Sequence, residues 1–173
     1  MGLFSEDVND LRALYVEGLR KALSSEKQIV EKGLPTMISA ATNQELVDAF
    51  RTHLEKSKLH VARLERILNA ATGQADDATC KATSTLIAEG SSEASDAKND
   101  AVRDASLIAS GNKIEHHEIA VYGTLRAWAG ILGENEAAGE LTKTLDEEKN
   151  ADVLLTRLSE QINIEAPVTT LSR

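Results

Sequence analysis

The chain has one cysteine and two prolines, and aromatic residues make up only 3% of its 173 positions. Because a single cysteine cannot form an internal disulfide, we expect a reduced, cytoplasmic setting. The Val, Ile, Tyr, Phe and turn residues of a β-sandwich or barrel are scarce, which favours long helices instead. The sequence has no apolar run near the roughly 18 residues of a membrane span, and its start has no apolar segment typical of a secretory signal.

Positive charge is also in short supply, with 19 Lys and Arg against 28 Asp and Glu and a formal net charge of -9. A protein that binds nucleic-acid backbones needs a basic face, so we expect no nucleic-acid partner. Hydrophobic residues form 42% of the chain, which is enough for one core and too few for a membrane protein. We therefore expect a single domain over residues 1–173, with no membrane association.

Apolar residues recur at three- and four-residue spacing in the first part of the chain, as they do on one face of a helix. The spacing predicts a first helix over about residues 5–41, beginning at Ser5 and kinked near Pro35. The motif Thr42-x-x-Glu45 is a capping box, and it predicts that a second helix begins there and runs to about residue 69.

The second part of the chain predicts two more long helices, over about residues 96–132 and 135–161. Between the two halves, residues 72–100 are rich in Ser, Asp, Ala and Gly and predict a crossover connection with a short helix around residues 80–88. Two helical hairpins joined by one long crossover are typical of an all-α, ferritin-like four-helix bundle. A heptad coiled coil is the alternative, but the glycines and the polar crossover argue against it.

Acidic side chains fall on the predicted apolar faces of three helices. They are Glu26 on the first helix, Glu115 and Glu118 on the third, and Glu148 and Asp152 on the fourth. Uncompensated carboxylates in a core of low dielectric would cost several kcal/mol each, and these faces carry no Lys or Arg at the same level. The acidic side chains therefore need a source of positive charge other than a side chain.

The second helix presents His53, Ser57 and His60 on its apolar face, whereas Glu55 projects to the opposite side. If the first helix continues to about residue 41, Glu26 is level with Ser57 and His60. If it ends near residue 33, Glu26 faces His53 instead. We expect His60 to face the acidic residues and leave His53 as the alternative.

Two divalent cations would nearly balance five carboxylates, and an imidazole adds a nitrogen ligand that suits iron, manganese or zinc. The sequence thus predicts a bundle core that binds one or two transition-metal ions, with iron as the first expectation and manganese or zinc as alternatives. The predicted metal ligands are Glu26, His60, Glu115, Glu118, Glu148 and Asp152.

Several stretches resemble the bacterial YciF/YciE-type ferritin-like stress-response family over about residues 4–158. They are Ser25-Glu26-Lys27-Gln28, His53-Leu54-Glu55, the run Lys113-Ile114-Glu115-His116-His117-Glu118-Ile119-Ala120-Val121-Tyr122-Gly123-Thr124, and Leu145-Asp146-Glu147-Glu148-Lys149. The resemblance implies a rubrerythrin-like bundle, a homodimer and a role in stress responses. It also implies that Glu26, Glu115 and Glu118 correspond to carboxylates found on the first and third helices of the wider superfamily.

The chain departs from the superfamily pattern at two positions. The Glu-x-x-His of the second helix is replaced by Ser57-x-x-His60, and Ala151 stands where the fourth helix would carry a histidine. These departures leave one ion as an alternative to two.

Three classes of function follow from a metal in the core. The first is a redox protein in which iron reacts with oxygen or peroxide, and the second is a structural or interaction module in which a metal only stabilises the bundle. The third is iron storage, which needs a shell-forming oligomer for which the sequence offers no support. The sequence leaves open whether the protein is an enzyme.

Overall fold

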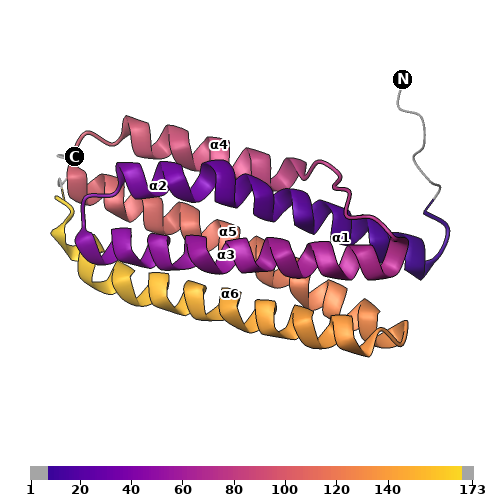
Figure 1. Cartoon of the computed structure of the whole chain (residues 1–173). Helices are drawn as coiled ribbons and strands as arrows, with labels where there is room; N and C mark the ends of the chain where they lie inside the picture. Colours follow the sequence, from indigo (N-terminus) through magenta and orange to yellow (C-terminus); the bar gives the residue numbers. More distant parts are fainter. Residues whose placement is uncertain (1–7, 169–173) are drawn as a thin grey trace, which may run out of the picture.

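The computed structural model describes residues 8–168, and every regular element in this part of the chain is a helix. The elements are α1 (Leu11–Gln28), the π-helix η1 (Ile29–Gly33), α2 (Leu34–Ala40), α3 (Gln44–Thr72), α4 (Lys81–Asp96), α5 (Asp100–Ile131), α6 (Asn135–Ile162) and the 3-10 helix η2 (Asn163–Glu165). Figure 1 shows an elongated bundle in which α1, η1 and α2 form one continuous rod. The predicted all-α fold of two long hairpins and a helical crossover is confirmed.

The crossover helix α4 packs along the outside of the bundle, chiefly against α5. It covers Lys81–Asp96, which is twice the length predicted from the sequence. Small residues explain why the prediction was too short, because they weaken the helical periodicity while allowing the two helices to approach closely. A Cβ atom added at Gly90 would lie 2.7 Å from the Ser110 hydroxyl.

The beginnings of three helices differ from the predicted positions. Residues 8–10 are not helical, and Asp10 caps α1 by accepting a hydrogen bond from the backbone N–H of Ala13, whereas Ser5 lies outside the described residues. The helix α5 begins at Asp100 rather than near residue 96, because Asn99 caps it. The α3 cap is Asn43, so the prediction of a capping box at Thr42 is wrong.

The first rod departs from regular α-helix just before Pro35. The departure is a π-helical turn and not the simple kink that the sequence predicted. Residues Ile29–Gly33 form a π-helical turn, in which the N–H of Leu34 donates to the carbonyl of Ile29. A proline has no N–H and its ring collides with a carbonyl one helical turn earlier, and a wider turn relieves that collision. The rod therefore continues to Ala40, as the sequence predicted.

The hydrophobic core consists of two clusters at different levels of the bundle. One cluster contains Leu19 of α1 and Leu64 of α3, and the other contains Ile29 of η1 and Phe50 of α3. On the first rod (α1, η1 and α2) and on α3, α5 and α6, residues of both clusters flank the acidic and histidine positions that the sequence singled out. The apolar levels thus enclose a polar layer from both ends.

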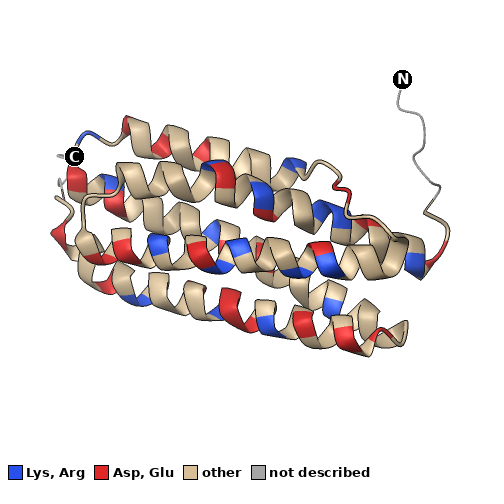
Figure 2. Cartoon of the chain, in the orientation of Figure 1, with Lys and Arg blue, Asp and Glu red and all other residues tan. Residues whose placement is uncertain are grey.

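Charged residues of both signs alternate along the outer faces of the bundle, as Figure 2 shows. Among the helices of residues 8–168, the structure contains none long and apolar enough to cross a membrane.

Asp104 of α5 joins the ends of α2 and α3, and its side chain is only 2% exposed. Its carboxylate accepts hydrogen bonds from the N–H and hydroxyl of Thr42 and from the N–H of Asn43, over 2.7–2.8 Å. We expect Asp104→Ala to lower the free energy of unfolding by about 2–4 kcal/mol, because two backbone N–H groups and a hydroxyl lose a charged acceptor and the buried side chain leaves a gap. Urea unfolding measures the loss, and Asp104→Asn, which keeps the shape of the side chain, should cost less. Equal stability of Asp104→Ala and the wild type would contradict this assignment.

Candidate metal centre

Four helices bring ionisable side chains into the polar layer. The contributors are Glu26 of α1, His53 and His60 of α3, Glu115 and Glu118 of α5, and Glu148 of α6, all of them buried. Each residue lies on the face of its helix that carries the apolar core residues, so the fold itself turns these polar groups inward.

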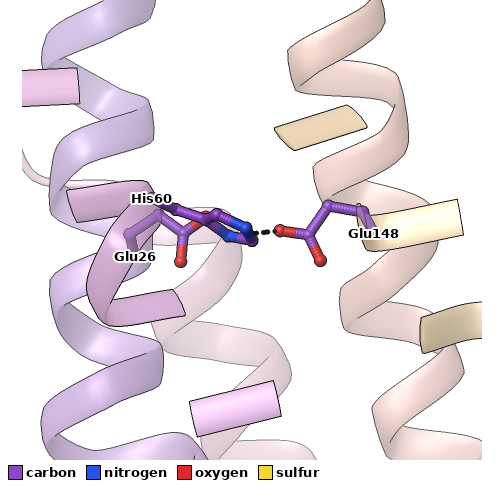
Figure 3. A group of neighbouring side chains, drawn as sticks. All are labelled: Glu26, His60 and Glu148. Carbon is purple, nitrogen blue, oxygen red and sulfur yellow. Dashed lines mark hydrogen bonds and ion pairs between the residues drawn. The ribbon is translucent and has the colours of Figure 1, made fainter. Parts of the chain in front are cut away.

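The first group joins Glu26, His60 and Glu148, and Figure 3 shows these side chains pointing toward one another. The Nδ1 atom of His60 lies 3.0 Å from Oε1 of Glu26 and 2.9 Å from Oε1 of Glu148. One potential ligand atom from each residue lies within 4.8 Å of the others. A single cation could therefore contact all three side chains.

A second group joins His53, Glu115 and the same Glu148. The Nε2 atom of His53 lies 3.2 Å from Oε1 of Glu115 and 3.5 Å from Oε2 of Glu148. The two oxygens of Glu148 thus face different histidines, one in each group. A carboxylate in this position can bridge two metal ions.

Glu118 lies beside these groups, and its Oε1 atom accepts a hydrogen bond of 2.6 Å from the Ser25 hydroxyl. Burial raises the pKa of Glu118 well above its usual value, and the charges of Glu26 and Glu148 raise it further. Burial also raises the pKa of Glu115 strongly, with Glu148 as the next cause. The folded chain without a cation therefore opposes ionisation of these two carboxyl groups.

The polar layer shifts the pKa values of the two histidines in opposite directions. Burial alone would lower the pKa of His60, but hydrogen bonds and charges from Glu148 and Glu26 raise it from 6.5 to about 10. Burial lowers the pKa of His53, and Glu148 opposes that effect only in part. The pKa of Glu148 itself is lowered, because its hydrogen bond with His60 and the charges of both histidines outweigh the effect of burial. In the metal-free protein, a proton on His60 thus takes the place of a cation.

Several buried polar atoms of this layer have no hydrogen-bond partner among the described residues. They are the Oε2 atoms of Glu26, Glu115, Glu118 and Glu148, Nδ1 of His53 and the hydroxyl of Ser57. Buried polar atoms are nearly always paired in folded proteins, so this layer offers unused donors and acceptors to water or an ion. Carboxylate oxygens together with imidazole nitrogens form a donor set that suits iron, manganese or zinc.

The structure brings four of the six predicted ligands into these two groups, with Glu118 alongside them. Asp152 joins neither group; its Oδ1 atom lies 3.2 Å from Nδ1 of His116 at the edge of the bundle. His53 and His60 both face the centre, although the sequence was interpreted as a choice between them. Their spacing of seven residues, close to two helical turns, was the signal that both belong to one face.

Residues outside the two groups hold the ligands in place. The Nε2 atom of His60 lies 2.8 Å from Oε2 of Glu147, which also accepts hydrogen bonds from Arg63. The Tyr122 hydroxyl donates to Oε1 of Glu26 over 2.6 Å. When the Nε2–H of His60 donates to Glu147, the Nδ1 atom is left free to bind a cation. Glu147 lies off the apolar face of its helix, so helical periodicity does not predict it.

We expect Glu147→Ala to lower the affinity for a divalent ion about 10- to 100-fold, because His60 loses the acceptor that orients its ring. Competition with a chelator of known affinity measures the change. Glu140→Ala is the matched control, since Glu140 also contacts Arg63 but does not contact His60. Wild-type affinity in Glu147→Ala would contradict the orienting role.

Cys80 is buried at the start of α4 and makes polar contacts. Its Sγ atom lies 3.8 Å from Nε2 of His117 and 3.3 Å from the Thr83 hydroxyl. The hydrogen bond from His117 is the main cause that lowers the pKa of Cys80 to about 6. The Thr83 hydroxyl is also bonded to that of Ser25, which links the thiol to Glu118 through two hydroxyl groups.

Comparison with known proteins agrees with this architecture. Residues 10–166 match the family described as "Domain of unknown function (DUF892)". The protein YciF of Escherichia coli K12 is 34% identical over 154 residues, which cover 88% of this chain and 92% of YciF.

Two solved structures share the fold over nearly their whole length. YcfI of Rhodopseudomonas palustris, described as a proposed structural protein, has a TM-score of 0.85 and 36% identity over 89% of this chain and 98% of its own. The E. coli stress protein YciF has a TM-score of 0.85 and 33% identity over 91% of this chain and 99% of its own. The chain therefore belongs to the YciF-type family described as DUF892.

Proposed function

We propose that this protein is a non-haem metal protein whose bundle core binds two transition-metal ions, iron in the first place, with Glu148 as the bridging ligand. The observation that carries the proposal is that Glu148 belongs to both ligand groups, with one carboxylate oxygen near each histidine. Glu26 and His60 would complete the ligands of one ion, and His53 and Glu115 those of the other.

The charge of the buried carboxylates and their unpaired oxygen atoms support the binding of two ions. Four buried carboxylates surround the layer, and two divalent cations supply four positive charges. The unpaired carboxylate oxygens would then act as metal ligands or contact metal-bound water. Each ion would have three donors, one from each residue of its group. Coordination positions would then remain for small molecules.

Bound iron would supply electron transfer to oxygen or peroxide at those open positions. The chain itself would hold the ions: Glu147 orients His60, and the Tyr122 hydroxyl fixes one oxygen of Glu26. The description of the relative YciF as a stress protein supports a role in defence against such oxidants.

The second candidate is a structural module, and the description of YcfI as a proposed structural protein favours it. In that case a metal only stabilises the bundle, and its coordination positions are closed.

Metal analysis of protein purified anaerobically, followed by addition of peroxide, distinguishes the two candidates. We expect about two ions per chain and, with ascorbate as the electron donor, repeated peroxide consumption without loss of metal. Stoichiometric but inert metal would favour the structural module, and protein that takes up no metal would contradict the metal centre and leave a structural module without metal.

A further inference from the structure

A cavity of about 40 Å³ lies between α3 and α6 and reaches the group of His53 and Glu115. The exposed residues Thr52 and Asn150 lie at its outer end. His53 and Glu115, which are 8% and 4% exposed, lie at its inner end. The cavity therefore connects the surface with one side of the candidate metal centre and not with the other.

Both residues at the inner end carry a buried polar atom without a partner among the described residues. These atoms are Nδ1 of His53 and Oε2 of Glu115. The Nε2 atom of His53 faces Glu115 and Glu148, so Nδ1 is not used in that group. His53 and Glu115 thus bring polar side chains rather than apolar ones to the inner end of the cavity.

The walls of the cavity limit the size of that occupant. Phe50, Leu154 and Leu155 form apolar walls, and Ala151 contributes only a methyl group. A cavity needs roughly 10–15 Å³ for one water-sized occupant, so 40 Å³ admits two or three linked atoms of that size. A larger side chain at Ala151 would therefore fill the cavity.

We propose that this cavity admits hydrogen peroxide to the His53 side of the metal centre and excludes organic hydroperoxides. The proposal rests on the proposed function and adds the substrate class and its route. The polar residues at the two ends, Thr52 and Asn150 outside and His53 and Glu115 inside, favour a hydrogen-bonding molecule over apolar dioxygen. The apolar walls and the volume exclude anything as bulky as a tert-butyl group.

A much larger cavity of about 680 Å³ also approaches the polar layer, and it is the rival route. It is lined by Cys80, His117 and Trp128 and ends at Ser25. The Ser25 hydroxyl is bonded to both Thr83 and Glu118, so no unpaired group faces a molecule arriving there. Substitutions in the two cavities separate the two routes.

The first experiment uses the metal-free protein and does not depend on metal chemistry. Water has the hydrogen-bonding groups of hydrogen peroxide, so we expect nuclear Overhauser effects between water and the ring protons of His53. Ala151→Leu, which fills the cavity, should remove them, and Ala82→Leu in the larger cavity should not. A His53 ring without water contacts in the wild type would overturn the proposal.

The second experiment compares peroxides on the iron-loaded protein. With ascorbate supplying the two electrons that reduce each peroxide, we expect hydrogen peroxide to be consumed at least about 100-fold faster than tert-butyl hydroperoxide, and Ala151→Leu to slow the consumption of hydrogen peroxide about tenfold with unchanged metal content. Leu154→Ala should widen the cavity and accelerate tert-butyl hydroperoxide about tenfold. If Ala151→Leu disturbs folding, Ala49→Leu at the same cavity replaces it.

The outcomes separate this inference from the proposed function. Equal rates for the two peroxides, or slowing by Ala82→Leu rather than by Ala151→Leu, would overturn the proposed route while the metal centre stands. Absence of iron uptake would overturn the proposed function and the route with it, and the water contacts of His53 would then describe a hydrated cavity only.

Discussion

Glu148→Ala is expected to abolish binding of both metal ions, whereas Glu55→Ala should leave binding unchanged. Glu148 is the residue common to both ligand groups, so its loss removes a ligand from each ion at once. The affinity for each ion should fall by more than about 100-fold, the upper range for residues that only orient a ligand. Titration with Mn²⁺ under anaerobic conditions, read by calorimetry, measures the loss.

Two further variants test whether both ions are lost because Glu148 belongs to both ligand groups. Glu148→Gln keeps the size of the side chain but removes its charge, and it should also lose both ions. Glu115→Ala should lose the ion on the His53 side, because Glu115 belongs to that group alone. Glu55 is exposed and paired with Lys58, which makes Glu55→Ala a matched control for loss of an acidic side chain. Retention of both ions in Glu148→Ala would refute the bridging role.

In the metal-free protein, the contribution of His60 to stability should decline as the pH rises from 6.5 to 8.5. The folded state raises the pKa of His60 to about 10 and keeps a proton that the unfolded chain releases near pH 6.5. This contribution is fully present below pH 6.5 and is lost as the pH rises toward 10. Burial raises the pKa values of Glu115 and Glu118, so their ionisation at higher pH also destabilises the folded state.

The lowered pKa values of Glu147 and Glu148 act at the acidic end, where stability falls as the pH drops below about 4.5. Between pH 6.5 and 8.5 the contribution of His60 should fall by about 2 kcal/mol, or roughly 5 °C in Tm for a chain of this size. The lowered pKa of Cys80 raises stability over the same range, so the fall is measured in the Cys80→Ala protein.

Thermal unfolding with a chelator and with Mn²⁺ at the two pH values measures this effect. A bound cation replaces the proton on His60 and favours ionised carboxylates, so the rise in Tm caused by the metal should be larger at pH 8.5 than at pH 6.5. His60→Gln should reduce the pH dependence in the chelator. A metal-free Tm of the Cys80→Ala protein that rises over this range would contradict the assignment of the His60 proton.

Helical periodicity was sufficient to predict which carboxylates face the core. It places Glu26, Glu115 and Glu148 inside, because each side chain direction follows from 3.6 residues per turn. It also predicts that Glu26 lies level with His60 if the first rod continues to about residue 41. In the structure, Oε1 of Glu26 lies 3.0 Å from Nδ1 of His60.

Other features depend on contacts between helices, which periodicity within one helix does not contain. Thr42 has the sequence signature of a cap, but its hydroxyl bonds to Asp104, which is 62 residues away. Glu147 lies on the flank of α6 and reaches His60 only because Arg63 holds it there. Asp152 lies one turn from Glu148 on the predicted stripe, yet it turns to His116 at the edge of the bundle.

The two hydrophobic clusters on either side of the polar layer have a consequence for metal exchange. Each cluster is built from apolar side chains of several helices, so the rods are held together above and below the layer without an ion. The ligands are then preorganised, in contrast to a zinc finger, which must acquire its metal in order to fold. We expect the chain to load and release its cations as a folded protein, with the ligand side chains rather than the helices adjusting to their arrival.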